Sequence, residues 1–284
     1  MNLLTYPHTL FTLFKLSWKL FQKNLVGMLV LTVVLLAPSL VVGLAKWFET
    51  ESVVFFLSMR VLESAMALGV IAMAHGSVFP PSGILRRMRS SMLFGSIHVA
   101  ILQYLLFVVG VMGLTVLPFP FNFVVVVLWL AGLFYFSLAQ PVFVLEGLRG
   151  MQAMVRSFRL VKTRFGRVFM VVGISMLMQF ILFALFFRIF LPDLNLQTTG
   201  ETEELQIQLS VILQDAGVHR AMRLSQYLTA LLFFPFAALL TVLLYFDLIR
   251  QEGQVKFEQF NKMANQLFGT PLQETVEPKP SPEE

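Results

Sequence analysis

The sequence contains no cysteine, and only 13% of its 284 residues are charged. The missing cysteine excludes disulfide bonds, zinc ribbons, iron–sulfur clusters and thiol catalysis. The scarcity of charge excludes a disordered chain and an ordinary cytosolic enzyme, because soluble domains are about 25% charged and about 45–50% apolar. Here 57% of the residues are hydrophobic, and the mean hydropathy is +0.78. These values predict an integral membrane protein.

The motifs of common catalytic and binding sites are also missing from the sequence. It has no nucleophile elbow of the Gly-x-Ser-x-Gly type, no Walker loop and no dinucleotide fingerprint. Its histidines stand far apart, and none has the spacing of a metal-ligating pair. We therefore expect a protein that is not an enzyme and has no catalytic residue, no metal site and no cofactor.

Several stretches of about 20 predominantly apolar residues stand out, the length that an α-helix needs to cross the hydrocarbon core. None of them alternates as the strands of a membrane β-barrel do. The third and fourth are joined by only a few residues that end in Pro118, which predicts a tight helical hairpin. The six predicted spans of this all-α protein are Leu25–Leu44, Ser52–Ala74, Ser91–Leu114, Phe119–Ala139, Val168–Leu191 and Tyr227–Leu248.

Lysine and arginine are unevenly distributed between the loops. Sixteen of the 21 fall within residues 1–24, 76–90, 139–167 and 249–284, which all lie on one side of the predicted membrane. Positive residues collect on the cytoplasmic side of membrane proteins. We therefore expect a multi-pass protein of the inner membrane with both termini in the cytoplasm. Because the cations follow the membrane ends instead of forming one patch, we expect no nucleic acid partner.

A short basic, amphipathic stretch precedes the first, third and fifth spans, at residues 9–24, 82–90 and 150–165. Ser17-Trp18-Lys19-Leu20 of the first stretch aligns with Ser157-Phe158-Arg159-Leu160 of the third, while the middle stretch is shorter. This order predicts three parallel repeats, each an interfacial helix followed by a helical hairpin. The alternative is that any segment beside a membrane gathers cations and aromatic residues.

The cations of these stretches recur at intervals of three and four residues, which places them on one helical face opposite aromatic side chains. Such a helix lies in the headgroup layer, where its cations meet anionic lipid. Its role is either to bind and organise lipid or simply to anchor the bundle. The residues expected to contact headgroups are Lys15, Lys19, Arg86, Arg87, Arg156, Arg159 and Lys162.

Two opposite charges lie inside the second predicted span. Arg60 and Glu63 stand roughly 12 and 17 Å along it, near the centre of the bilayer. Each charge at that depth costs about 2.5–3.5 kcal/mol, so such residues face protein or water and usually pair. They form either a polar site for an ion or lipid headgroup, or a self-neutralised pair that locks the helices.

Gln103 and Gln179, in the third and fifth spans, are expected to form hydrogen bonds between helices.

Charged residues also mark the cytoplasmic ends of the fourth and sixth spans. Glu146, Asp247 and Arg250 are expected to clamp the basic helix at 150–165 to the bundle by ion pairs. We call this set the cytoplasmic clamp.

The chain divides into one membrane domain and one tail. The membrane domain is expected to cover residues 1–255 and to include an extracytoplasmic loop at 192–226. Residues 256–284 are expected to form a cytoplasmic tail. Its part after residue 269 is rich in proline and glutamate, which predicts disorder.

Two motifs of the sequence resemble a known membrane family. The first runs from Pro141 to Gly147 (PVFVLEG) and is followed by Arg156-Ser157, and the second runs from Leu244 to Gly253 (LYFDLIRQEG). Together they resemble the membrane domain associated with glycerophosphoryl diester phosphodiesterases and its stand-alone relatives of unknown function. The resemblance implies a six-helix inner-membrane module over residues 10–255. It does not imply the phosphodiesterase reaction, which in fused members belongs to a separate soluble barrel of about 250 residues.

Two functions from different classes fit these observations. The first is a non-catalytic scaffold, assembly or lipid-organising module that works through its basic interfacial helices. The second is a transporter or channel subunit for a lipid or small solute that passes Arg60 and Glu63. For either function the expected partners are membrane lipids, anionic ones first, together with other membrane proteins or further copies of the chain.

Overall fold

The computed structural model describes residues 9–44, 48–74, 79, 81–88, 90–118, 120–191 and 216–252. Within this part of the chain every regular element is a helix, and six spans are long and apolar enough to cross a membrane. The prediction of an all-α, multi-pass membrane protein is therefore confirmed. Residues 192–215 of the predicted outer loop and the predicted tail after residue 255 lie outside the described residues.

The described part of the chain contains both short and long helices. The last of them begins well before Tyr227, so that residues 216–226 of the predicted outer loop are helical. In chain order the helices are α1 (Leu10–Lys23), α2 (Leu25–Leu44), α3 (Phe48–Ala74), α4 (Pro81–Arg87), α5 (Ser90–Val116), α6 (Phe121–Tyr135), α7 (Ala139–Glu146), α8 (Met151–Thr163), α9 (Phe165–Phe190) and α11 (Ala216–Glu252).

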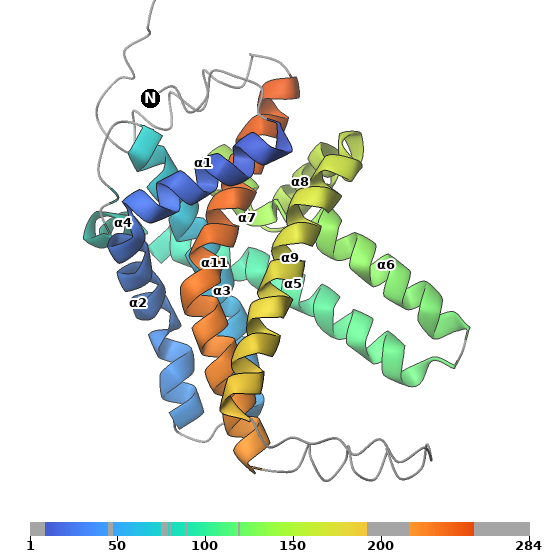
Figure 1. Ribbon diagram of the computed structural model, residues 1–284. Helices are drawn as coiled ribbons and strands as arrows, with labels where there is room; N and C mark the ends of the chain where they lie inside the picture. Colours follow the sequence, from blue (N-terminus) through green and yellow to red (C-terminus); the bar gives the residue numbers. More distant parts are fainter. Residues whose placement is uncertain are drawn as a thin grey trace, which may run out of the picture.

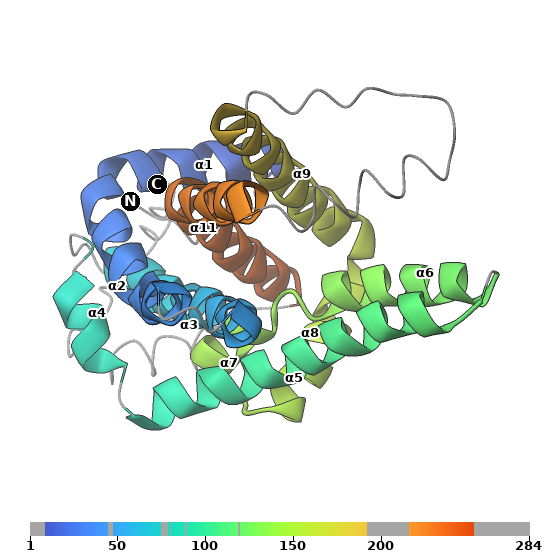
Figure 2. The ribbon, with the colours of Figure 1, turned by 90° about the horizontal axis from the view of Figure 1, so that it is seen from below.

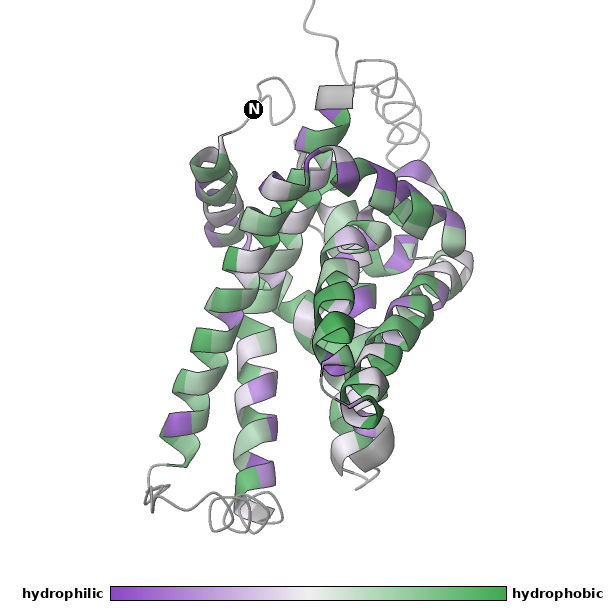
Figure 3. Cartoon of the chain, turned by 90° about the vertical axis from the view of Figure 1, so that its right-hand side faces the viewer, coloured by the Kyte–Doolittle hydropathy of each residue, from purple (hydrophilic) through white to green (hydrophobic). Residues whose placement is uncertain are grey.

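Helices α3 and α11 form the centre of the bundle. They are buried over 67% and 61% of their spans, whereas the other four spans are buried over 28% or less. Helices α2 and α9 pack beside this centre (Figure 1). Hydrophobic residues prevail along the long helices (Figure 3). The central position of α3 explains how it carries charged residues, because those must face protein or water inside a bilayer.

Helices α5 and α6 form the predicted hairpin, which leans away from the other long helices (Figures 1 and 2). Small residues let the two helices approach closely. A Cβ atom at Gly110 would lie 2.1 Å from the Trp129 ring, and one at Gly113 would lie 2.6 Å from the Val125 side chain. Close contacts of this kind replace the hydrophobic effect between helices in lipid.

The fourth span is interrupted, whereas the sequence predicted a single helix ending at Ala139. Helix α6 ends at Tyr135, residues 136–138 form a turn, and α7 continues to Glu146. Pro141 explains the interruption, because proline lacks an N–H and its ring clashes with the carbonyl four residues earlier. That carbonyl belongs to Ser137 in the turn. The fourth span therefore runs from Phe121 to Glu146 and ends later than the predicted Ala139.

One end of the bundle is covered by short helices. Helix α1 crosses over α11 at this end, and α8 lies at the same end (Figures 1 and 2). Leu13 and Leu20 of α1 are buried, and Trp18 and Phe21 pack edge-on against Phe236 of α11. These contacts fix α1 on the bundle and leave its opposite face exposed.

Candidate functional site

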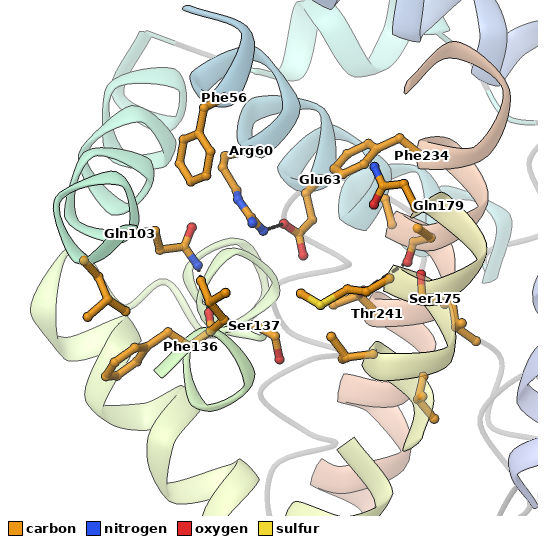
Figure 4. A pocket seen from close by; sticks show the side chains of 18 residues that line it. Phe56, Arg60, Glu63, Gln103, Phe136, Ser137, Ser175, Gln179, Phe234 and Thr241 are labelled. Carbon is orange, nitrogen blue, oxygen red and sulfur yellow. Dashed lines mark hydrogen bonds and ion pairs between the residues drawn. The ribbon is translucent and has the colours of Figure 1, made fainter. Parts of the chain in front are cut away.

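A cavity of about 110 Å³ lies among α3, α5, α6, α9 and α11 (Figure 4). It has room for several water molecules, which require about 30 Å³ each in the liquid. Much of its wall is apolar, including Phe56, Leu106 and Val171. The polar residues on the wall are Arg60, Glu63, Gln103, Ser137, Ser175, Gln179 and Thr241.

The intramembrane pair lies on this wall. Arg60 donates from Nη1 to Glu63 Oε2 at 2.9 Å, and their side chains are 25% and 3% exposed. The guanidinium carbon also lies 5.1 Å from the centre of the Phe56 ring, which adds a cation–π contact. Arg60 Nε is buried and has no hydrogen-bond partner among the described residues. The pair is therefore joined, yet the guanidinium keeps an unused donor at the cavity.

Gln103 of α5 connects the cavity to the interrupted span. Its Nε2 donates at 2.8 Å to the Phe136 carbonyl in the turn between α6 and α7, which also accepts from the Ala139 N–H. This is an interhelical bond of the kind that the sequence predicts. Gln103 Oε1 is buried without a hydrogen-bond partner in the described part of the chain. Phe136 and Ser137 of the turn also line the cavity. Irregular backbone at membrane depth is tolerated where it is buried or lines a polar cavity.

A buried polar network joins α3, α5 and α7. Ser64 donates its hydroxyl to Gln140 Oε1 at 2.8 Å and lies 2.8 Å from the Ser96 hydroxyl. Gln140 Nε2 donates to the Ser96 carbonyl at 3.1 Å, and all three residues are fully buried. Sequence reasoning missed this network, because a single serine or glutamine in an apolar helix has no distinctive spacing.

The residues of the cytoplasmic clamp do not all act on the same helix. Glu146 accepts one bifurcated hydrogen bond from Arg156 Nε–H, at 3.1 Å to Oε1 and 3.0 Å to Oε2, and another from the Tyr245 hydroxyl at 3.1 Å. It therefore connects α7, α8 and α11. Asp247 instead pairs at 2.7 Å with Arg167, which belongs to α9 and not to α8. Arg250 is exposed near the end of α11.

The expected headgroup-contacting cations divide into two groups. Arg156 differs from the expectation, because it is half-buried and its guanidinium faces Glu146 inside the protein. Arg87 is also half-buried. The other cations are exposed on α1, α4 and α8, namely Lys15, Lys19, Arg86, Arg159 and Lys162.

A second charged cluster lies at the opposite end of the bundle, and sequence reasoning missed it. Glu51 of α3 is buried and accepts a hydrogen bond from the Tyr227 hydroxyl at 3.0 Å. Arg223 Nη1 lies 3.7 Å from the other carboxylate oxygen of Glu51. Gly43 makes room for this carboxylate, since a Cβ there would lie 2.7 Å from Glu51 Oε1. The cluster ties α2, α3 and α11 together.

Comparisons with protein-family models, with curated proteins and with solved structures found no match for this chain. The resemblance to the phosphodiesterase-associated membrane domain therefore stays a prediction. Glu146, Arg156 and Tyr245, three residues of its motifs, share one set of hydrogen bonds. Among the described residues, no group of acidic and histidine side chains is placed to hold a metal ion.

The bond between α7 and α8 predicts a stability difference between two arginines of the same helix. The Arg156→Gln substitution leaves the Glu146 carboxylate without its charged donor, and we expect it to lower the free energy of unfolding by about 2 kcal/mol. Arg159→Gln is the matched control, because that side chain is exposed and such changes stay within about 0.5 kcal/mol. Denaturant unfolding in detergent micelles measures both. Equal losses for the two variants would contradict the clamp.

Proposed function

We propose that this chain is a non-enzymatic, six-span protein of the inner membrane that organises anionic lipid at its cytoplasmic surface. The observation that carries the proposal is the set of exposed cations on α1, α4 and α8, which all lie at one end of the bundle. Cations concentrate on the cytoplasmic side of membrane proteins, so this end would face the cytoplasm together with both termini. The cluster of Glu51, Arg223 and Tyr227 would face the other side.

The exposed face of α1 suits the headgroup layer. Lys15 and Lys19 are exposed, Trp18 is 51% exposed, and Phe11 is 77% exposed. Tryptophan prefers the interface, where its ring reaches acyl chains while its N–H stays near water. Each lysine close to an anionic surface contributes about 1 kcal/mol. Trp18 therefore shares the exposed face with the lysines, instead of lying on the opposite face as the sequence predicted. Cations and aromatic rings on one exposed face favour binding to anionic lipid over a purely mechanical anchor.

Helix α8 repeats this arrangement. Arg159 and Lys162 are exposed, and so are the apolar side chains of Val155 and Phe158 beside them. The opposite face of α8 is buried through Leu160 and its neighbours. Helix α8 is thus tied to the bundle on one side and offers cations with apolar neighbours on the other.

The order of the helices supports the proposal of three parallel repeats. The short helix α1 precedes α2 and α3, α4 precedes α5 and α6, and α8 precedes α9 and α11. In the repeat interpretation each unit adds one basic interfacial helix to the same membrane surface. The resemblance to the phosphodiesterase-associated domain fits this proposal, because it also implies an inner-membrane module without its own catalysis.

The fluorescence of Trp18 tests the lipid proposal. It is measured in a variant in which Trp47→Phe and Trp129→Phe remove the other two tryptophans. We expect brominated anionic lipid to quench Trp18 more strongly than brominated phosphatidylcholine in reconstituted vesicles. The double substitution Lys15→Glu/Lys19→Glu should lower this preference at least about tenfold, because two attractive charges become repulsive.

The control for this experiment makes the same charge change at the opposite end. Arg188 and Arg220 are exposed there, and Arg188→Glu/Arg220→Glu should leave the quenching ratio at Trp18 unchanged. An anionic preference that survives Lys15→Glu/Lys19→Glu would show that α1 only anchors the bundle.

The cavity favours a second candidate function, a transporter or channel subunit for a lipid or small solute. A polar cavity reaches Arg60 and Glu63, and the fourth span is interrupted beside it at residues 136–138. Interrupted helices whose freed backbone groups face a site near the bilayer centre are typical of transporters. The intramembrane pair would then contact the transported molecule in addition to joining the helices.

Access from water tests the transporter proposal, and the absence of native cysteine makes each introduced thiol unique. Ser175→Cys places a thiol on the cavity wall, whereas Thr229→Cys places one on a buried position of α11 away from it. We expect a small, charged thiol reagent to modify residue 175 in native membranes much faster than residue 229. Equal rates would exclude a water-accessible pathway through the cavity.

A further inference from the structure

The cavity wall presents one donor and one acceptor that lack partners. Arg60 Nε on α3 and Gln103 Oε1 on α5 are both buried, and neither meets a hydrogen-bond partner within the described ranges. Both residues reach the same cavity from different helices (Figure 4). Buried polar atoms are nearly always satisfied by protein, water or a ligand. A single occupant that both accepts and donates hydrogen bonds would satisfy these two atoms.

The charge of the cavity limits the kind of occupant. Arg60 and Glu63 carry opposite charges 2.9 Å apart, so the site is neutral as a whole. A ligand with a net charge would leave an uncompensated charge in a low-dielectric interior, which is strongly unfavourable. The occupant that fits this site is therefore neutral overall.

The two charged side chains also keep unused bonding capacity. A guanidinium has five N–H donors, and a carboxylate has two oxygens that accept hydrogen bonds. The ion pair joins Nη1 of Arg60 to Oε2 of Glu63, so Nε–H and the second carboxylate oxygen stay outside it. Charge-assisted bonds are the strong ones, so an anionic oxygen suits Arg60 and an ammonium group suits Glu63. A zwitterion carries both groups and stays neutral.

The position of the cavity indicates a lipid as the source of this zwitterion. Its volume of about 110 Å³ suits a headgroup and leaves acyl chains outside. Met176 of α9 lines the cavity and is 41% exposed, and its neighbour Leu177 is 58% exposed. The wall of the cavity therefore continues into an apolar surface where acyl chains can pack.

We propose that the cavity binds the headgroup of a zwitterionic phospholipid with a primary ammonium group. A phosphate oxygen accepts the hydrogen bond from Arg60 Nε, and the ammonium group donates to Glu63 and to Gln103 Oε1. The inference rests on the second candidate function only in that both use the same cavity. Headgroup binding does not require transport, because it is measured in closed vesicles without any flux.

Photo-crosslinking from the cavity wall tests the proposal. Benzoylphenylalanine in place of Phe234 reports on the cavity, and the same residue in place of Phe180, which is 67% exposed on α9, reports on bulk lipid. The protein is reconstituted in equal amounts of phosphatidylethanolamine and phosphatidylglycerol, and the cross-linked lipids are identified by mass spectrometry. We expect at least about tenfold enrichment of phosphatidylethanolamine at Phe234 over Phe180, the ratio that one charge-assisted hydrogen bond supplies.

Two variants assign this enrichment to the intramembrane pair. Arg60→Met/Glu63→Gln removes both charges together and should reduce the ratio at Phe234 to that at Phe180. Arg60→Lys keeps the charge and the pairing with Glu63 but removes the Nε–H donor, so it should lower the enrichment in a protein that still folds. Substitution of Lys15 and Lys19 should leave it unchanged, which separates this site from the anionic lipid surface.

Several results would overturn the proposal. Equal lipid ratios at Phe234 and Phe180 would mean that the cavity samples bulk lipid only. Cross-links from Phe234 to protein alone would mean that water fills the cavity. Enrichment of phosphatidylglycerol at Phe234 would contradict the argument from a neutral site. A loss of anionic preference at Trp18 has no bearing on these outcomes, so each proposal fails or stands by itself.

Discussion

A lipid bilayer offers no hydrogen bonds to an interrupted helix, and the rest of this structure depends on how the protein meets that constraint. The turn between α6 and α7 interrupts the regular helical hydrogen bonding of the fourth span. Gln103 donates to the Phe136 carbonyl, Ser157 donates to the Tyr135 carbonyl, and Ser137 donates to the Phe134 carbonyl. The backbone N–H groups of Ala139 and Ser137 also donate to the Phe136 and Phe134 carbonyls. Side-chain and backbone donors together therefore satisfy the turn, where an unpaired group would cost several kcal/mol in hydrocarbon.

The same turn connects the two regions to which functions are proposed. Ser157 belongs to α8, whose outer face carries Arg159 and Lys162, while Gln103 belongs to the wall of the cavity. Glu146, at the end of α7, holds α8 through Arg156 and contacts Tyr245 of α11. The basic surface and the polar cavity are thus joined through one short, buried helix.

Composition and spacing predicted the spans, because a run of about 20 apolar residues has few alternatives to a membrane helix. The turn at residues 136–138 was missed although Pro141 signals it, since hydropathy stays high through the turn. Arg156 was assigned to the lipid surface because helical spacing predicts a charged face but does not show that the Glu146 carboxylate of another helix pairs with it. The network of Ser64, Ser96 and Gln140 depends on three helices meeting, and no local pattern reveals that.

A chain that crosses the membrane six times should keep its exposed cations on the cytoplasmic side. Single cysteines labelled by an impermeant thiol reagent test it most directly, because the native sequence has none. Gln22 on α1, Gln152 on α8 and His219 on α11 are all exposed. We expect Gln22→Cys and Gln152→Cys to react only from the cytoplasmic side and His219→Cys only from the opposite side. Labelling of residues 22 and 219 from the same side would contradict the account.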